Sequence, residues 1–143
     1  MSSPSQYPIL LAEDNPNDLL FIKRAIDRGS LPVILYHVVN GEEAVSYLKG
    51  EGQYGDRERY PLPSLVISNM KMPRMNGLQL LQWIRQRSAW RDLPVVVLSS
   101  SGDPGEVGQF ERLGANSYFV KPVDLNDLVT TLQQVIAFLP PLG

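Results

Sequence analysis

Five side chains that are able to bind a metal ion or a phosphate group stand at the ends of short apolar runs in this sequence. They are Glu13, Asp14, Asn69, Ser99 and Lys121. Paired carboxylates bind a hard divalent cation such as Mg²⁺, which prefers oxygen ligands and keeps several waters. A serine hydroxyl and a lysine ammonium donate hydrogen bonds to phosphoryl oxygens. If the fold brings these side chains together, they can position a phosphoryl group and stabilise the charge that develops on it.

The apolar runs predict a fold that would do this. Five such runs alternate with segments of helical periodicity, at residues 9–12, 33–36, 65–67, 95–98 and 118–120. Three of the runs are continuously apolar, which is typical of strands buried on both faces of a parallel sheet. Five repeats of strand and helix with right-handed crossovers predict a doubly wound α/β fold. Because ligands bind at the carboxyl ends of such strands, we expect the polar residues to share one crevice.

Length and composition indicate one globular domain. The chain has 143 residues, of which 43% are hydrophobic and 20% charged, and both values are ordinary for a single folded unit. We predict a disordered N-terminal tail over residues 1–7, a domain over residues 8–139 and a C-terminal tail over residues 140–143. Residues 50–63 form a polar segment rich in glycine, arginine and tyrosine, for which we predict a mobile surface loop.

The charge and residue counts exclude several kinds of partner. The net charge is −2 and there is no cysteine, so we expect no nucleic-acid binding, no attraction to an anionic membrane and no thiolate chemistry. The first eight residues lack the apolar segment of a signal peptide. No apolar run approaches the roughly 20 residues of a membrane span. We therefore expect a cytoplasmic protein.

Five segments of the sequence resemble the receiver domain of two-component response regulators. They are residues 9–16, 72–77, 94–99, 114–116 and 121–122. Each is weak alone, whereas all five in this order, at the ends of predicted strands, are specific. The resemblance covers about residues 8–139 and implies a flavodoxin-like fold with strand order 2-1-3-4-5. The long loop before the third strand and the run at residues 121–125 are most similar to stand-alone receivers that pair with phytochromes.

The resemblance also implies a Mg²⁺ site with one substituted position. Glu13 and Asp14 match the acidic pair that holds the ion, and Lys71 matches the residue whose backbone carbonyl contacts it. Asn69 falls where the family carries its phosphate-accepting aspartate. A carboxylate can attack phosphorus, whereas an amide is uncharged and its nitrogen lone pair is delocalised. We therefore expect no phosphorylation of Asn69, weak or absent Mg²⁺ binding, and weaker repulsion among the acids.

Other residues receive roles by resemblance only. Ser99 matches the hydroxyl that engages the phosphoryl group, and Tyr118 matches the aromatic residue that changes rotamer in concert with it. Lys121 matches the lysine of the site, and the resemblance implies a cis bond between it and Pro122. His37 is the only histidine, and we interpret it as structural because no partner pattern surrounds it.

Two explanations of Asn69 stay open at the level of sequence. The chain is either a natural receiver that has lost phosphorylation, or an ordinary receiver whose aspartate was deliberately replaced. Because the other site residues are in place, we predict that Asn69→Asp restores labelling by a small phosphodonor. The sequence alone does not separate the two explanations.

The leading function is a signalling module whose partner is a sensor histidine kinase of the phytochrome type. We expect a homodimer through the fourth helix, fifth strand and fifth helix, and Ile136, Phe138 and Leu139 either extend that interface or pack in the core. The alternative from another class is a phosphohydrolase, which would need a nucleophile where the chain has Asn69. A transcription factor would need a basic face or a helix-turn-helix. Because the amide of Asn69 is not a nucleophile, we expect no enzymatic activity.

Overall fold

The structure is a computed structural model that describes residues 6–100 and 102–141. Within these residues five strands form one parallel sheet in the order β2-β1-β3-β4-β5, which confirms the predicted fold and strand order. The strands are β1 (Tyr7–Ala12), β2 (Val33–Val38), β3 (Leu65–Asn69), β4 (Val95–Ser99) and β5 (Ser117–Val120). The helices are α1 (Pro16–Arg28), α2 (Gly41–Lys49), α3 (Gly77–Arg85), α4 (Pro104–Arg112) and α5 (Leu125–Ile136), with short 3-10 helices at Gly52–Gly55 and Ser88–Trp90.

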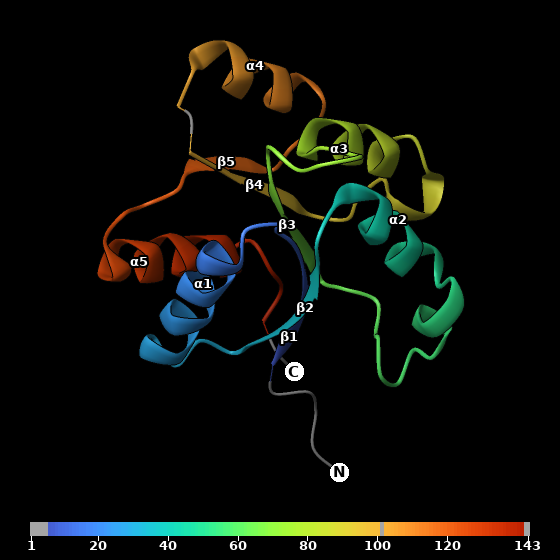
Figure 1. The fold of residues 1–143 in the computed structure, drawn as a ribbon, viewed down its shortest axis with the longest axis horizontal. Coiled ribbons are helices and arrows are strands. Elements are labelled where there is room, and N and C mark those ends of the chain that lie inside the picture. Colours follow the sequence, from blue (N-terminus) through green and yellow to red (C-terminus); the bar gives the residue numbers. More distant parts are fainter. Residues whose placement is uncertain (1–5, 101, 142–143) are drawn as a thin grey trace.

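Helices cover both faces of the sheet, which explains the continuously apolar strands. Helices α1 and α5 lie side by side on one face, and α2, α3 and α4 cover the other (Figure 1). In β1, Ile9 and Leu11 pack toward the first group, whereas Leu10 and Ala12 pack toward the second. Because side chains alternate between the faces, both kinds of position in a doubly covered strand favour apolar side chains. In β1 and β3 the charged and amide side chains therefore stand at or just beyond the carboxyl end.

Polar side chains cap every one of the five α-helices at its N-terminus, where backbone N–H groups lack partners within the helix. The capping residues are Asn15, Asn40, Asn76, Asp103 and Asp124. At α3 the capping box is complete, because the side chain of Gln79 also accepts the backbone N–H of Asn76. These caps fix where the site loops join the helices.

The folded domain begins earlier than the sequence indicated. Tyr7 belongs to β1 and is buried, and its hydroxyl donates a hydrogen bond to the carbonyl of Pro140. The predicted start of the domain at residue 8 is therefore wrong by one residue. Tyr7 can be buried because its ring packs in the core while its hydroxyl has a hydrogen-bond partner. Residues 1–5 of that predicted tail lie outside the described residues. At the other end, α5 stops at Ile136 and Leu139 still packs in the core.

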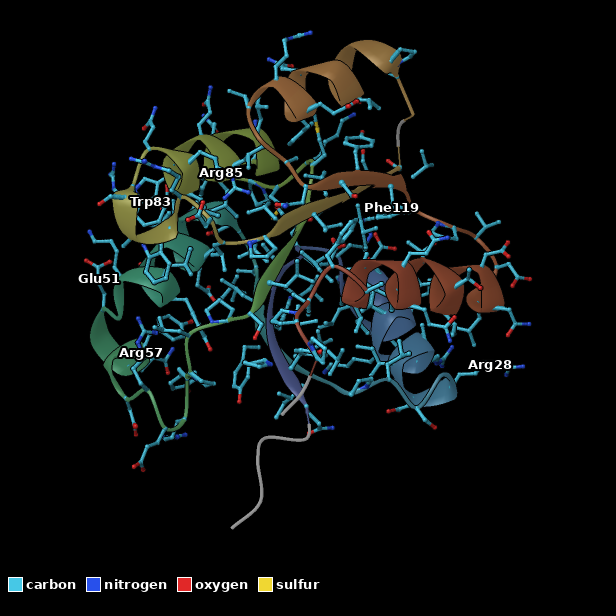
Figure 2. All side chains as sticks on the ribbon, turned by 180° about the vertical axis from the view of Figure 1, so that it is seen from behind. Arg28, Glu51, Arg57, Trp83, Arg85 and Phe119 are labelled. Carbon is cyan, nitrogen blue, oxygen red and sulfur yellow. The ribbon has the colours of Figure 1, made fainter. Side chains whose placement is uncertain are left out.

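The segment at residues 50–63 lies on the surface, as predicted, but it is bonded to α2. The guanidinium of Arg57 donates to the carbonyls of Tyr47 and Leu48 at 2.9 Å each, and the Tyr47 hydroxyl donates to the Pro61 carbonyl at 2.8 Å. Tyr54 and Tyr60 pack edge to face, with ring centroids 5.1 Å apart. Figure 2 shows Arg57 on this segment. These contacts argue against the predicted mobility, because Arg57 satisfies carbonyls that the end of α2 leaves without partners.

Candidate functional site

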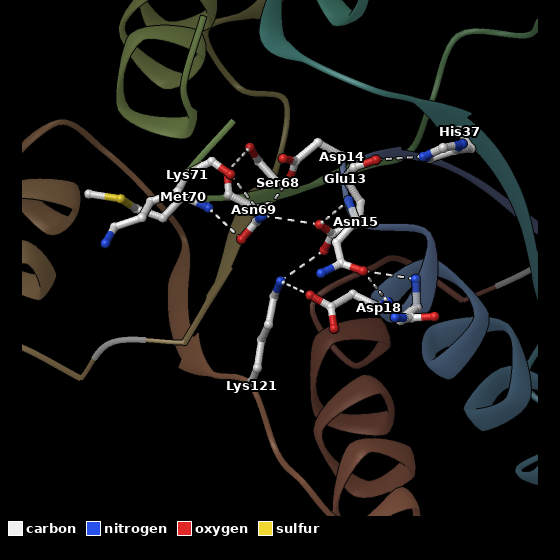
Figure 3. A network of polar contacts seen from close by, with 11 residues as sticks. Glu13, Asp14, Asn15, Asp18, His37, Ser68, Asn69, Met70, Lys71 and Lys121 are labelled. Carbon is white, nitrogen blue, oxygen red and sulfur yellow. Dashed lines mark hydrogen bonds and ion pairs between the residues drawn. The ribbon is translucent and has the colours of Figure 1, made fainter. Parts of the chain in front are cut away.

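The carboxyl ends of the strands bring the predicted site residues together. Glu13 and Asp14 follow β1 and face Asn69, the last residue of β3 (Figure 3). Ser99 ends β4 and Lys121 follows β5. One open pocket is lined by Asp14, Asn15, Asp18, Asn69, Lys71, Ser99, Ser100 and Lys121. The predicted crevice therefore exists, whereas the chemical roles of its residues stay predictions.

The side-chain amide of Asn69 lies among three oxygen acceptors. Its Nδ2 is 3.0 Å from Glu13 Oε2, 3.2 Å from Asp14 Oδ1 and 3.0 Å from the backbone carbonyl oxygen of Lys71. Its Oδ1 accepts the backbone N–H of Met70 at 3.0 Å. The hydrogen-bond chemistry fixes the orientation of the amide, because a carbonyl oxygen facing two carboxylates would find no donor there.

Lys121 forms ion pairs with two carboxylates, those of Glu13 and Asp18. Its Nζ lies 2.9 Å from Glu13 Oε1 and 2.8 Å from Asp18 Oδ2. Burial alone would lower the pKa of Lys121, but the hydrogen bonds and charges of Asp18 and Glu13 outweigh it and raise the pKa. The site thus holds three acids, Glu13, Asp14 and Asp18, one more than the acidic pair predicted from sequence. Asp18 was missed because it lies in the first turn of α1 and does not stand at a strand end.

Glu13 is the buried centre of the network. Its side chain is 1% exposed, yet both carboxylate oxygens have partners, because Oε1 accepts from Lys121 and Oε2 accepts from Asn69 and from the backbone N–H of Asn15. Burial raises the pKa of Glu13 above its ordinary value, and the bond and charge of Lys121 oppose that rise. A buried carboxylate is tolerated only when it is paired and hydrogen-bonded in this way.

Two residues outside the pocket fix the backbone of the site. His37 Nε2 lies 2.7 Å from the backbone carbonyl oxygen of Glu13, and it must carry the hydrogen because a carbonyl only accepts. Gly77 packs so closely on β3 that a Cβ at this position would overlap the backbone carbonyl oxygen of Asn69. The backbone N–H of Gly77 also donates to the carbonyl of Met70 at 2.9 Å. Because its ring holds the backbone at Glu13, His37 has the structural role that we expected.

The two residues with predicted switching roles lie on the neighbouring strands β4 and β5, in different surroundings. Ser99 is buried and lines the pocket. Tyr118 is half-buried and packs on Phe110 of α4, with ring centroids 5.5 Å apart. The peptide bond between Lys121 and Pro122 is trans. The cis bond that the resemblance implied is therefore wrong for this structure, and the trans form is the one that X–Pro bonds prefer intrinsically.

The arrangement does not fit a divalent cation as it stands. The oxygens of Glu13, Asp14 and Lys71 that the sequence assigned to Mg²⁺ point at the amide nitrogen of Asn69 instead. No group of three or more His, Asp or Glu residues within residues 6–100 and 102–141 is placed to hold a metal ion.

None of the helices in that part of the chain is long and apolar enough to cross a membrane.

Comparison with known proteins identifies the class to which this fold and site belong. Residues 9–133 match the response regulator receiver domain. The chain is 32% identical to the two-component response regulator ARR9 of Arabidopsis thaliana over 90% of this chain, but it spans only 58% of that protein. It is 29% identical to the response regulator Rcp1 of Synechocystis, with 96% of this chain and 93% of Rcp1 covered. The chain belongs to the response regulator receiver family.

Solved structures place it beside receivers that are associated with phytochromes. The response regulator RPA3017 in red light signalling of R. palustris is 29% identical, with a TM-score of 0.88 and 96% of this chain and 98% of that chain covered. The phosphorylated cyanobacterial phytochrome response regulator RcpA is 28% identical, with a TM-score of 0.83 and coverage of 96% and 99%. A Mn²⁺-bound form of Rcp1 is 28% identical, with a TM-score of 0.79 and coverage of 94% and 99%. These likenesses confirm the receiver fold and the resemblance to phytochrome-associated receivers.

Proposed function

We propose that this chain is a receiver that acts in two-component signalling through protein contacts, without accepting phosphate at residue 69. One observation carries the proposal: the amide of Asn69 stands at the end of β3 between the acidic pair, where a phosphate-accepting carboxylate would otherwise face them. An acyl phosphate forms only on a carboxylate, and the nitrogen of an amide is not nucleophilic. Lys121 is engaged by Glu13 and Asp18, which supports a resting arrangement that does not depend on a charge at residue 69.

Labelling with a small-molecule phosphodonor in the presence of Mg²⁺ tests this proposal. The unaltered protein should keep its mass, and Asn69→Asp should gain the mass of one phosphoryl group, because Asp14, Ser99 and Lys121 already line the pocket. Asn126→Asp, which adds the same carboxylate on the exposed start of α5, is the matched control and should stay unlabelled. Phosphate found on the unaltered protein at residue 69 would overturn the proposal.

We propose a phytochrome-type sensor histidine kinase as the partner. The support is the similarity to RcpA and to the regulator from red light signalling. Binding to the purified kinase region of such a sensor can be measured by calorimetry, with a kinase from an unrelated chemosensory pathway as the control. Equal binding to both kinases would count against a phytochrome-type partner.

We also propose a homodimer through α4, β5 and α5. Val120 on the edge strand β5 and Phe138 after α5 are both about half exposed, whereas Leu139 packs in the core. Of the three apolar residues near the C-terminal end, only Phe138 is therefore free to extend the interface, since Ile136 also packs on the core. Sedimentation velocity should show a dimer that Val120→Lys disrupts, and a monomer at all concentrations would refute this assignment.

The remaining functional assignments follow from the same chemistry. We propose that the chain has no catalytic activity of its own, because the position that would supply a nucleophile holds an amide. We propose a cytoplasmic location, as expected from the sequence. We also propose no binding to nucleic acid or membrane, because the net charge of −2 offers no basic field. Hydrolysis of a generic phosphoester by the purified protein would contradict the first of these assignments.

A further inference from the structure

We infer that the side-chain amide of Asn69 takes the place of the divalent cation, so that the site is assembled without metal. The inference rests on the proposed function, because both start from an amide at residue 69. It goes further, since it concerns how the pocket holds itself together. Nδ2 contacts the same three groups that the family resemblance assigned to Mg²⁺, namely the carboxylates of Glu13 and Asp14 and the carbonyl of Lys71.

The three contacts join two separate loops. Glu13 and Asp14 belong to the connection between β1 and α1, and Lys71 belongs to the connection between β3 and α3. A cation bound by these oxygens would tie the loops together by electrostatic attraction. The amide does this through hydrogen bonds from Nδ2 to the carboxylates of Glu13 and Asp14 and to the carbonyl of Lys71. The two bonds to charged carboxylates are stronger than bonds between neutral groups. The loops are therefore linked by the chain itself.

The buried acceptor that faces the amide, the carboxylate of Glu13, already has hydrogen-bond partners on both oxygens. Glu13 is 1% exposed, and its two oxygens accept from Lys121, from Asn69 and from the backbone N–H of Asn15. A buried carboxylate with open lone pairs would favour a cation, whereas one with these donors does not need it. Mg²⁺ also sheds its waters reluctantly, so it would have to lose water and displace the amide as well.

Rotation of the amide does not rescue the metal site. A half-turn about the bond to the amide group would point Oδ1 at the cation and Nδ2 at the backbone N–H of Met70, which now donates to Oδ1 at 3.0 Å. Two donors would then face each other, and the N–H of Met70 would lose its acceptor. Leaving such a group without a partner is costly. The present orientation is therefore the one that excludes the ion.

Thermal unfolding with and without metal tests the inference. The unaltered protein, Asn69→Asp and Asn69→Ala are each melted in a chelator and in about 10 mM Mg²⁺, at which a binding site of millimolar affinity is nearly saturated. The melting temperature of the unaltered protein should not change. Asn69→Asp should melt lower in the chelator, because the new carboxylate then faces those of Glu13 and Asp14 and is repelled by them, and Mg²⁺ should raise its melting temperature by about 5 °C.

Asn69→Ala tests whether Mg²⁺ is excluded because the amide occupies the site or because residue 69 carries no charge. It vacates the position of the amide nitrogen without adding a carboxylate, so Mg²⁺ should raise its melting temperature too, by less than for Asn69→Asp. Gln133→Glu, which adds one negative charge on the exposed side of α5, is the control for a general effect of charge and should not respond to Mg²⁺.

Two results would overturn the inference. The first is a melting temperature of the unaltered protein that rises with Mg²⁺ as much as that of Asn69→Asp, since the ion would then displace the amide. The second is an Asn69→Ala variant as insensitive as the unaltered protein, since a missing charge would then be enough to exclude the ion. Either result could occur while the unaltered protein still resists phosphodonor labelling, so the inference can fail while the proposed function stands. In nuclear magnetic resonance spectra, the side-chain amide hydrogens of Asn69 should also be protected from exchange in the chelator.

Discussion

Replacing Lys121 by methionine measures what the buried ion pairs of the pocket contribute to stability. Methionine keeps most of the length of the side chain and removes the ammonium, which lies 2.9 Å from Glu13 Oε1 and 2.8 Å from Asp18 Oδ2. Glu13 then keeps its bonds to Asn69 and Asn15 but loses its partner at Oε1, in a place where its side chain is almost completely buried. The variant therefore leaves one buried carboxylate incompletely paired.

The structure sets the size of the expected loss. Removing one partner of a fully buried ion pair costs about 3–5 kcal/mol. The side chains of Lys121 and Asp18 are 18% and 38% exposed, so solvent screens part of the attraction and hydrates Asp18 once the ammonium is gone. We therefore expect Lys121→Met to lower the free energy of unfolding by about 2–3 kcal/mol at neutral pH.

The loss should depend on pH, with a sign that follows from Glu13. Burial raises the pKa of Glu13, and Lys121 opposes that rise, so removing Lys121 raises the pKa further. A carboxyl group whose pKa is higher in the folded than in the unfolded state stabilises the fold at low pH and loses that contribution as the pH rises through the folded pKa. The difference between Lys121→Met and the unaltered protein should therefore shrink as the pH falls from about 7 to about 5.

Urea unfolding followed by the fluorescence of Trp83 and Trp90 is a suitable assay, because midpoint and slope together give the free energy. Lys49→Met is the matched control, since Lys49 pairs with Glu51 at 3.3 Å with both side chains about half exposed. Such a surface pair contributes less than about 1 kcal/mol. The reasoning is refuted if Lys121→Met costs no more than Lys49→Met, or if its cost is the same at both pH values.

Four further substitutions test separate parts of the structure by the same unfolding assay. Asp18→Ala should cost about 1 kcal/mol and should add little to Lys121→Met, because the two residues share one interaction. Arg57→Ala should cost about 1–3 kcal/mol, because the carbonyls of Tyr47 and Leu48 lose their donor, and limited proteolysis should then cut the segment at residues 50–63 faster. Gly77→Ala should cost about 2 kcal/mol, because its Cβ would overlap the carbonyl oxygen of Asn69. In contrast, Gly108→Ala in α4 meets only the flexible end of Arg112 and should gain about 0.5–1 kcal/mol.

The fold was predictable from sequence because its strands are covered on both faces. Continuous burial kept charged and amide residues out of β1, β3 and β4 before their last residues, and Ser68 is the one serine buried inside β3, so the change from apolar to polar marked each carboxyl end to within a residue. The strand order came from the family resemblance, since periodicity alone does not order strands in a sheet. The start of β1 was missed because the apolar run in the sequence begins only at Ile9, whereas pairing with Val33 and the contact with Pro140 make Tyr7 part of the fold.

The site was predictable in its membership but not in its bonding. Parallel strands require Glu13, Asn69 and Lys121 to meet at one edge, and they do. Which acid Lys121 binds depends on the geometry of α1, which brings Asp18 to 2.8 Å from it. The direction of the Asn69 amide depends on the backbone N–H of Met70 and the carbonyl of Lys71, and backbone groups leave no trace in a residue pattern.

The bond between the Tyr7 hydroxyl and the Pro140 carbonyl brings the two ends of the domain next to each other. Tyr7 opens β1, so both ends lie at the amino edge of the sheet and the pocket lies at the opposite edge. A short glycine-rich linker could close the backbone into a ring there, and new ends could be opened between α2 and β3 without cutting a strand or helix. Such a circular permutant should keep the pocket intact. A fluorescent label attached at either end would likewise stand clear of any protein that docks on the carboxyl edge.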